Sequence, residues 1–170
     1  MNEFPENLWA PWRMEYIAGM EQDCACFLCS YRDEPAADAK HHVLWRTQDT
    51  IVLLNRFPYT NGHLLIATLD HLADLNDLSP AKLSSLMIQT RDSKRVLEHV
   101  LGPHGFNIGI NLGRCAGAGL PGHIHLHVVP RWNGDTNFMS VLGDVRVIPQ
   151  ALDKLYDQLK GAACELGLPK

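Results

Sequence analysis

Three features typical of membrane, exported and nucleic-acid-binding proteins are missing from this sequence of 170 residues. No apolar run approaches the roughly 20 residues that span a bilayer, so no membrane partner is expected. The start, "MNEFPENLWAPWRMEYI", lacks the basic and apolar segments of a signal peptide, so a cytoplasmic location is expected. Lys and Arg number 15 against 19 Asp and Glu. Without a global basic field no nucleic-acid partner is expected, although a local phosphate site stays open.

The chain also lacks internal repeats and any linker that would divide it. Its length is that of one ordinary domain, long enough to bury a core. Hydrophobic residues make up 46% of the chain and charged residues 20%, which is a globular balance. We therefore predict a single domain over residues 1–170.

Short β-branched and aliphatic runs predict the strands. The first three runs, at 43–47, 50–56 and 63–68, are separated only by "QD" and "FPYTNG", which favours an antiparallel meander. Further strands are predicted at 106–112 and 123–131. The polar stretch 31–42, "YRDEPAADAKHH", is predicted to be a loop.

Two amphipathic helices are predicted between and after these strands. In the first, Ser79 can cap the helix, Pro80 suits its first turn, and Gly102 ends it. Its apolar residues, expected to pack on the sheet, are Leu83, Leu86, Met87, Leu97, Val100 and Leu101. The C-terminal helix is marked by Leu152, Leu155, Tyr156, Leu159 and Ala163. This organisation predicts an α+β fold, an antiparallel sheet with helices packed on one side.

Three histidines, His123, His125 and His127, alternate with apolar residues in "HIHLHVVP". Successive strand side chains point to opposite faces, so the imidazoles should share one face of the sheet. Burying neighbouring imidazoles without hydrogen-bond partners, or protonating them together, costs free energy. The arrangement is therefore expected to serve a function. They could be metal ligands, or a nucleophile beside a proton donor. The preceding loop, 113–122, has four glycines whose amides could approach an anion, which favours a phosphate site.

The cysteines number five, and three of them crowd into "CACFLC". In a reducing compartment such a cluster is more often a metal or redox site than a disulfide framework. Cys26 and Cys29 form a CxxC half-site for tetrahedral zinc, which needs two further ligands.

Several of these motifs resemble those of the histidine triad (HIT) family. "HIHLHVVP" is similar to the defining motif of that family, and "NRFPYTNGHLLIATLDHLADLNDLS" resembles its nucleotide-binding hairpin. "LWAPWRMEYI" and "PRWNGDTNF" resemble a prokaryotic branch that contains diadenosine tetraphosphate phosphorylases and hydrolases. The resemblance implies a HIT-like fold with its core at about 24–132 and extensions at both ends.

The resemblance also implies a role for each matched residue. His125 matches the family's nucleophile, which attacks the α-phosphorus of a nucleotide. His127 matches the residue that contacts phosphate and helps the leaving group depart, and His63 matches a fourth histidine packed behind the triad. Asn55 matches the side chain that holds the ribose hydroxyls, although it would also suit a turn before Pro58.

Phosphate contacts are implied for Asn111 and for the end of the glycine-rich loop, Ala118 and Gly119. Where relatives often carry a hydroxyl or amide side chain in that loop, this chain offers only backbone amides. This departure leaves the substrate affinity and the identity of the acceptor open. Trp132 is expected either to wall the nucleotide site or to pack in the core or at a dimer contact.

A structural zinc ion is implied as well. In family members and related uridylyltransferases with such cysteines, the remaining ligands are a histidine beginning "DH..DL" and the first triad histidine. The implied ligands here are Cys26, Cys29, His71 and His123. A pair of buried free thiols is the alternative, and Cys24 could replace one of the pair. No role is assigned to Cys115 or Cys164.

Together, these matches imply an enzyme that binds a nucleotide substrate. The implied reaction is nucleotidyl transfer or hydrolysis of a dinucleoside polyphosphate, such as diadenosine tetraphosphate, through a covalent nucleotidyl-histidine. The acceptor is phosphate or water, and the outer motifs favour a phosphorylase over a hydrolase. A homodimer is implied by resemblance alone. The competing hypothesis is a non-catalytic nucleotide-binding or zinc-binding regulatory module on the same scaffold.

Overall fold

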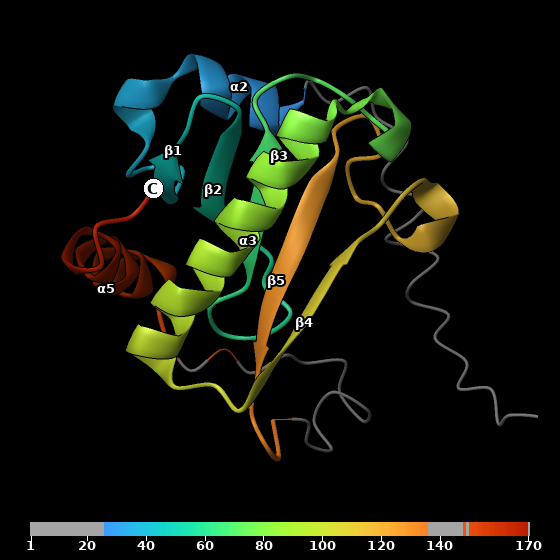
Figure 1. Ribbon diagram of the computed structural model, residues 1–170. Coiled ribbons are helices and arrows are strands. Elements are labelled where there is room, and N and C mark those ends of the chain that lie inside the picture. Colours follow the sequence, from blue (N-terminus) through green and yellow to red (C-terminus); the bar gives the residue numbers. More distant parts are fainter. Residues whose placement is uncertain (1–25, 136–147, 149, 170) are drawn as a thin grey trace, which may run out of the picture.

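A five-stranded antiparallel sheet lies at the centre of the computed structural model, which describes residues 26–135, 148 and 150–169 (Figure 1). The strands are β1 (Val43–Arg46), β2 (Thr50–Leu54), β3 (Leu64–Thr68), β4 (Gly105–Ile110) and β5 (His125–Arg131). Their order across the sheet is β1-β2-β3-β5-β4, with every neighbouring pair antiparallel. The predicted meander of the first three strands is confirmed, and β5 lies between β3 and the edge strand β4.

The long helix α3 (Pro80–Leu101) connects β3 to β4 and begins and ends where the sequence predicts. The Ser79 side chain accepts a hydrogen bond from the backbone N–H of Lys82 and caps the first turn. Gly102 follows the last turn with φ of 53°, a left-handed conformation that favours glycine at this position.

The buried face of α3 differs from the prediction. Leu86 and Leu97 are buried as expected, but Leu83 and Met87 are 37% and 59% exposed. Polar residues take their place in the interior: Gln89, Thr90, Asp92 and Ser93. Two of these polar side chains are satisfied by hydrogen bonds, since Gln89 accepts one from the Trp45 indole and Thr90 donates one to the Leu86 carbonyl. Val100 and Leu101 are partly buried and pack against the core, so apolar spacing predicted four of the six residues correctly and missed the polar part of the face.

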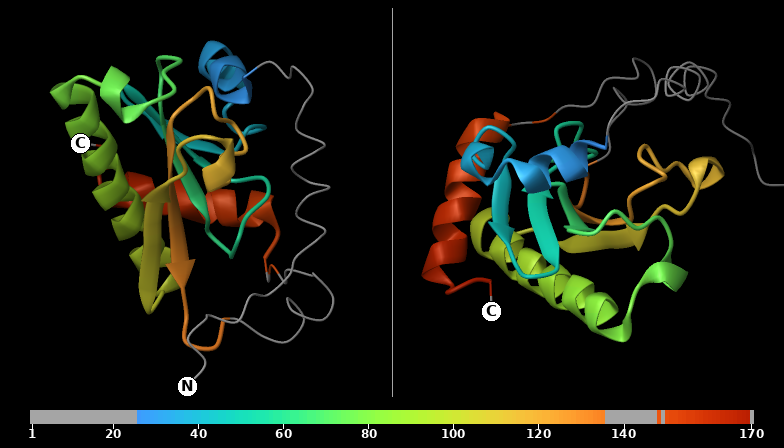
Figure 2. Two further views of the ribbon diagram at one scale, coloured as in Figure 1. Left: turned by 90° about the vertical axis from the view of Figure 1, so that its right-hand side faces the viewer. Right: turned by 90° about the horizontal axis from the view of Figure 1, so that it is seen from above.

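The C-terminal helix α5 (Leu152–Glu165) packs beside α3 on the same face of the sheet (Figure 2). Of its predicted core residues, Leu155, Tyr156, Leu159 and Ala163 are buried, and Leu152 is half-buried. The Tyr156 hydroxyl donates to the Val43 carbonyl at 3.2 Å, which ties α5 to β1. The predicted α+β architecture, with both long helices on one side of the sheet, is confirmed.

A short helix, α2 (Phe27–Asp33), covers part of the opposite face, as the right-hand view of Figure 2 shows. Its buried Leu28 and Tyr31 pack against sheet residues that alternate with those facing α3 and α5, namely Val43, Ile51, Leu53, Leu65 and Ala67. The loop predicted at 31–42 is therefore wrong at its start, where α2 continues to Asp33 and a 3-10 turn follows at Pro35–Ala37. No helix among the described residues is long and apolar enough to cross a bilayer.

Candidate active site and metal centre

The triad histidines lie on the face of the sheet that carries α2. In the register of β3 and β5, His125 is opposite Ala67 and His127 is opposite Leu65, both of which belong to the α2 side. The intervening apolar residues point the other way, into the core under α3 and α5: Ile124, Leu126 and Val128. The predicted separation of imidazoles and apolar side chains is confirmed. The predicted strand at 123–131 is wrong at its start, because β5 begins at His125 and His123 lies in the segment that precedes it.

His125 is held as a neutral imidazole with one nitrogen bare. Its ring is buried, with 6% of the residue exposed, and Nδ1 lies 2.7 Å from the carbonyl oxygen of His123. A carbonyl only accepts hydrogen bonds, so Nδ1 must carry the proton. Burial lowers the pKa of His125, which keeps Nε2 unprotonated at neutral pH. That bare nitrogen has the lone pair that a nucleophile requires.

His127 contacts both His125 and a second buried histidine, His63. The His125 and His127 rings are 5.0 Å apart between centroids, and His63 Nε2 lies 2.9 Å from His127 Nδ1. Burial, followed by the charge of His125, lowers the pKa of His127 to about 4. Nε2 of His127 is buried without a hydrogen-bond partner among the described residues. An unpaired buried polar atom is costly, which indicates a place for a ligand atom.

The Asn55 side chain is joined to this cluster from the turn that follows β2. Its Nδ2 lies 3.2 Å from His63 Nδ1, and its Oδ1 accepts from the backbone N–H of Phe57 at 3.0 Å. Sequence reasoning missed Tyr59 in the same turn. The Tyr59 ring stacks 5.8 Å from the His127 ring, and its N–H donates to His63 Nδ1. The sequence signal for Tyr59 was its position, an aromatic residue four positions before His63.

The glycine-rich loop is brought to the nucleophile by the pairing of β4 with β5. Gly109 is opposite His127 and Ile110 is opposite Leu126, where the pairing ends, and Asn111 is the first residue after β4. Asn111 also donates to the Gly117 carbonyl at 3.4 Å, which fixes the loop.

The two loop residues predicted to contact phosphate, Ala118 and Gly119, differ in whether their backbone N–H groups are available. Ala118 is buried, and its N–H donates to the Gly113 carbonyl within the loop at 3.3 Å. The exposed Gly119 has an N–H without a hydrogen-bond acceptor among the described residues. Of these two loop residues, only Gly119 therefore has a backbone N–H that is available to a phosphate oxygen.

Trp132 is not brought to the histidines within this chain. It follows the end of β5, five residues beyond His127, which at about 3.3 Å per residue is roughly 16 Å along the strand. It is half-buried, and its N–H donates to the carboxylate of Asp135 at 3.1 Å. Trp132 belongs to neither core cluster of the described residues, so both roles that the sequence left open stay predictions.

The four predicted zinc ligands converge at the end of the sheet beside α2. Cys26 Sγ lies 3.1 Å and Cys29 Sγ 3.6 Å from His123 Nδ1, and Cys29 Sγ lies 3.3 Å from His71 Nδ1. All four ligand atoms are within 4.8 Å of one another. Tetrahedral zinc with S and N ligands sets these separations at roughly 3.3–3.8 Å. The geometry therefore fits the ion.

The protonation of these side chains also suits a cation. His123 Nε2 donates to the Thr68 carbonyl at 2.8 Å, so the bare Nδ1 faces the two thiols. Burial, then the hydrogen bond and charge of Cys26, raise the pKa of the Cys29 thiol. A Cys29 thiolate without a cation is therefore unfavourable, and a divalent metal would reverse that effect.

Two of the remaining cysteines lie outside this cluster. Cys115 and Cys164 are exposed free thiols. Cys24 lies outside the described residues, as do the stretch "LWAPWRMEYI" and the end of "PRWNGDTNF".

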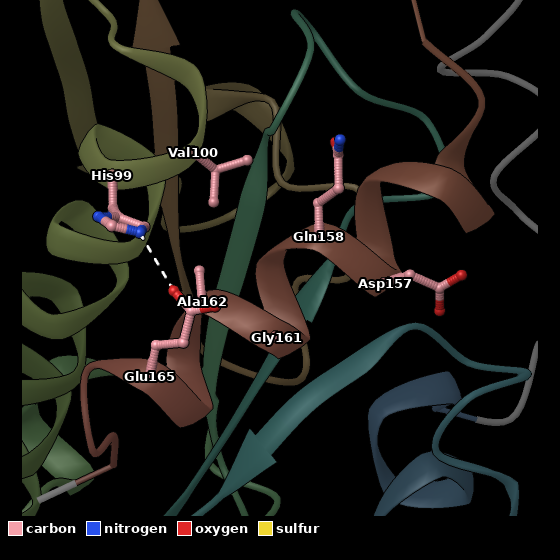
Figure 3. Close-up of a pocket in the computed structure, with 7 residues that line it drawn as sticks. All are labelled: His99, Val100, Asp157, Gln158, Gly161, Ala162 and Glu165. Atoms are coloured by element: carbon pink, nitrogen blue, oxygen red, sulfur yellow. Dashed lines mark ion pairs between the residues drawn. The ribbon is translucent and has the colours of Figure 1, made fainter.

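A hollow of about 370 Å³ on the other side of the molecule is distinct from this site (Figure 3). It lies between the C-terminal end of α3 and the stretch of α5 from Asp157 to Glu165, where an ion pair joins His99 to Glu165. Those helices cover the face of the sheet opposite to His125 and His127. The candidate active site is consequently assigned from the histidine cluster and not from this hollow.

Comparison with known proteins agrees with this geometry. Residues 36–134 match the model of the HIT domain family, more than half of the chain. The chain belongs to the HIT domain family. It is 39% identical over 153 residues to the AP-4-A phosphorylase of Mycobacterium tuberculosis, covering 86% of this chain and 78% of the relative. It is also 34% identical over 93 residues to the asymmetrical bis(5'-nucleosyl)-tetraphosphatase of Schizosaccharomyces pombe, covering 55% of this chain and 50% of that protein.

Solved structures of HIT proteins share the fold. A zinc-bound histidine triad family protein from Mycobacterium smegmatis superimposes with a TM-score of 0.66 at 29% identity, covering 82% of this chain and 95% of that one. A hypothetical histidine triad nucleotide-binding protein from Sulfolobus tokodaii has a TM-score of 0.67 at 18% identity, covering 83% and 93%. The second likeness supports the fold alone.

Proposed function

We propose that this protein is a nucleotidyltransferase that cleaves a dinucleoside polyphosphate through a covalent intermediate on His125. The observation that carries the proposal is the bare Nε2 of His125 beside the unpaired Nε2 of His127. One nitrogen is able to attack, and the other is able to donate to a leaving oxygen. The similarity to an AP-4-A phosphorylase supports this class of substrate.

In the proposed reaction, Nε2 of His125 attacks the α-phosphorus, and the bond from that phosphorus to the bridging oxygen breaks. The proton on His127 Nε2 stabilises the departing oxygen. The acceptor then attacks the nucleotidyl-imidazole, and the N–P bond breaks. We assign phosphate contacts to Asn111 and the Gly119 amide, and a ribose contact to Asn55. Positioning and electrostatic stabilisation supply most of the acceleration.

The identity of the acceptor gives a first prediction. With diadenosine tetraphosphate and inorganic phosphate, transfer of the adenylyl group to phosphate should yield ADP and ATP, and the rate should rise with phosphate. Chromatography of the products with and without phosphate measures both effects. AMP as the sole monophosphate, formed at a rate indifferent to phosphate, would assign water as the acceptor. Nucleotide binding without any turnover would favour the non-catalytic module.

We also propose a structural zinc held by Cys26, Cys29, His71 and His123. The ion would neutralise the two thiolates and join α2 to the segments that follow β3 and precede β5. The zinc-bound relative from Mycobacterium smegmatis supports this. Thiolate ligands persist in a reducing compartment, which supports a cytoplasmic location.

A homodimer is proposed from the surface beside β4. This strand is at the edge of the sheet, and Ile108 on it is 44% exposed. On α3, Met87 is 59% exposed and shares a helical stripe with Lys94, whose ammonium lies over the ring of Phe106 on β4. Met87 and Ile108 therefore border one surface along a strand edge that no other described strand pairs with, and a second copy of the chain would cover it.

Placing charge on this surface should separate the copies. We expect the double variant Met87→Glu and Ile108→Glu to be monomeric at micromolar concentration, where the wild type is a dimer. Light scattering after size-exclusion chromatography measures the mass. Leu75→Glu, which alters an apolar side chain 37% exposed elsewhere, is the control and should remain dimeric. A monomeric wild type would contradict the proposal.

A further inference from the structure

We propose that Asn55 is a positioning residue for His127, because it fixes which nitrogen of His127 carries the proton. The inference rests on the proposed function and goes beyond the ribose contact assigned to Asn55 above. It concerns a chain of hydrogen bonds that runs from the turn after β2, through His63, to His127. The direction of that chain decides whether His127 presents a donor or an acceptor to the substrate.

The orientation of the Asn55 carboxamide is determined by its surroundings. Its oxygen accepts from the Phe57 N–H at 3.0 Å, and its nitrogen lies 3.2 Å from His63 Nδ1. Rotating the amide by half a turn would place two donors against each other at Phe57. The NH₂ group of Asn55 therefore donates to His63 Nδ1.

A second donor converges on the same nitrogen. The backbone N–H of Tyr59 lies 3.1 Å from His63 Nδ1, and a peptide N–H can only donate. His63 is fully buried, with 0% exposed. With two donors aimed at Nδ1, this nitrogen must be bare, and the ring proton of neutral His63 must be on Nε2.

The direction of the remaining bonds follows. His63 Nε2–H donates to His127 Nδ1 at 2.9 Å, so Nδ1 of His127 is bare as well. A neutral His127 must then carry its proton on Nε2, the buried atom without a described partner. If these hydrogen bonds ran in the opposite direction, Nε2 of His127 would carry a lone pair, which would repel the oxygen of a leaving phosphate. Asn55 thus acts on the reaction through two histidines without touching the breaking bond.

Asn55→Asp is the discriminating substitution, because it is nearly isosteric and keeps two acceptor oxygens for ribose hydroxyls. A carboxylate cannot donate to His63 Nδ1, and it can accept a charge-assisted hydrogen bond from a protonated Nδ1. Such a bond is roughly twice as strong as a neutral one, so it should outweigh the remaining donor, the Tyr59 N–H. His63 Nε2 then becomes an acceptor for His127 Nδ1–H, and Nε2 of His127 loses its proton. Asn55→Ala removes the ribose contact as well, so it should also raise KM.

Nitrogen-15 NMR of the histidine side chains measures the tautomers directly, without turnover. In the wild type, both His63 and His127 should show a protonated Nε2 and a bare Nδ1. In Asn55→Asp, the proton of His127 should move to Nδ1. Asn76→Asp is the matched control, since Asn76 is exposed in the 3-10 turn at Leu75–Asp77, and it should leave both signatures unchanged.

Kinetics provides the second readout. For a dinucleoside polyphosphate, kcat of Asn55→Asp should fall by about ten- to a hundred-fold, at or below the lower range for loss of a proton donor, while KM stays within about two-fold. With the p-nitrophenyl ester of AMP, whose leaving group departs without a proton, the loss should shrink to a few-fold.

Two results would overturn the inference. One is a wild-type His127 with its proton on Nδ1, and the other is an Asn55→Asp protein in which His127 keeps Nε2–H. A wild type that turns over neither substrate would instead refute the proposed function, and the NMR result would still decide the direction of the hydrogen bonds.

Discussion

A His125→Ala protein should lose turnover of a dinucleoside polyphosphate almost completely while its nucleotide affinity changes by no more than a few-fold. The substitution removes the attacking nitrogen, whereas Asn55, Asn111 and the Gly119 amide belong to other elements and remain in place. The loss is therefore confined to the transition state, and kcat should fall without a matching rise in the dissociation constant.

His127→Ala should be impaired less severely. Here the nucleophile is intact and only assistance to the leaving group is lost, so we expect a rate lower by ~10²–10⁴-fold. This variant should still form a nucleotidyl-enzyme, which mass spectrometry of quenched reactions detects, whereas His125→Ala should form none. Calorimetric titration with a nucleotide product measures the affinity of both variants.

His99→Ala removes an exposed histidine whose ion pair with Glu165 lies on the opposite face of the sheet, so its turnover should match the wild type. A His125→Ala protein that turned over the dinucleotide near the wild-type rate would refute the covalent mechanism. The triad would then have to be considered again as a set of metal ligands.

The strand that carries the triad was predictable because one short-range rule governs it. Side chains alternate along a strand, so His125 and His127 had to share a face and Leu126 had to point into the core. The ends of α3 were predictable for the same reason, since Ser79 and Gly102 act on their own backbone. Rules that act within a few residues can be applied to a sequence directly.

Features that depend on distant partners were not predictable in this way. Gln89 is buried on α3 because the Trp45 indole reaches it from β1, 44 residues earlier in the chain. The proposed metal centre joins Cys29 to His71, 42 residues apart, and Cys26 to His123, 97 residues apart. The CxxC pattern indicated half of that centre, and only the family resemblance supplied the two histidines.

Removing one zinc ligand should destabilise the whole domain. We expect Cys26→Ser to lower the melting temperature by roughly 10 °C, because metal-binding free energy is folding free energy, and several kcal/mol correspond to such a shift in a domain of this size. Cys164→Ser changes an exposed thiol outside the cluster and should melt like the wild type. Thermal unfolding followed by circular dichroism compares the three proteins.

Thermal unfolding in the presence of a chelator distinguishes the effect of losing the metal from the effect of losing the thiol. A strong chelator should bring the wild type down to the melting temperature of Cys26→Ser and should leave that variant unchanged, since both then lack the ion. The protein that remains folded should still bind nucleotide, because Asn55 and Asn111 lie outside the metal centre. Elemental analysis of purified wild type should find one zinc per chain, and a content well below one would refute the assignment. Cys26 and Cys29 would then be free thiols, whose pairing with His123 and His71 rests on hydrogen bonds alone.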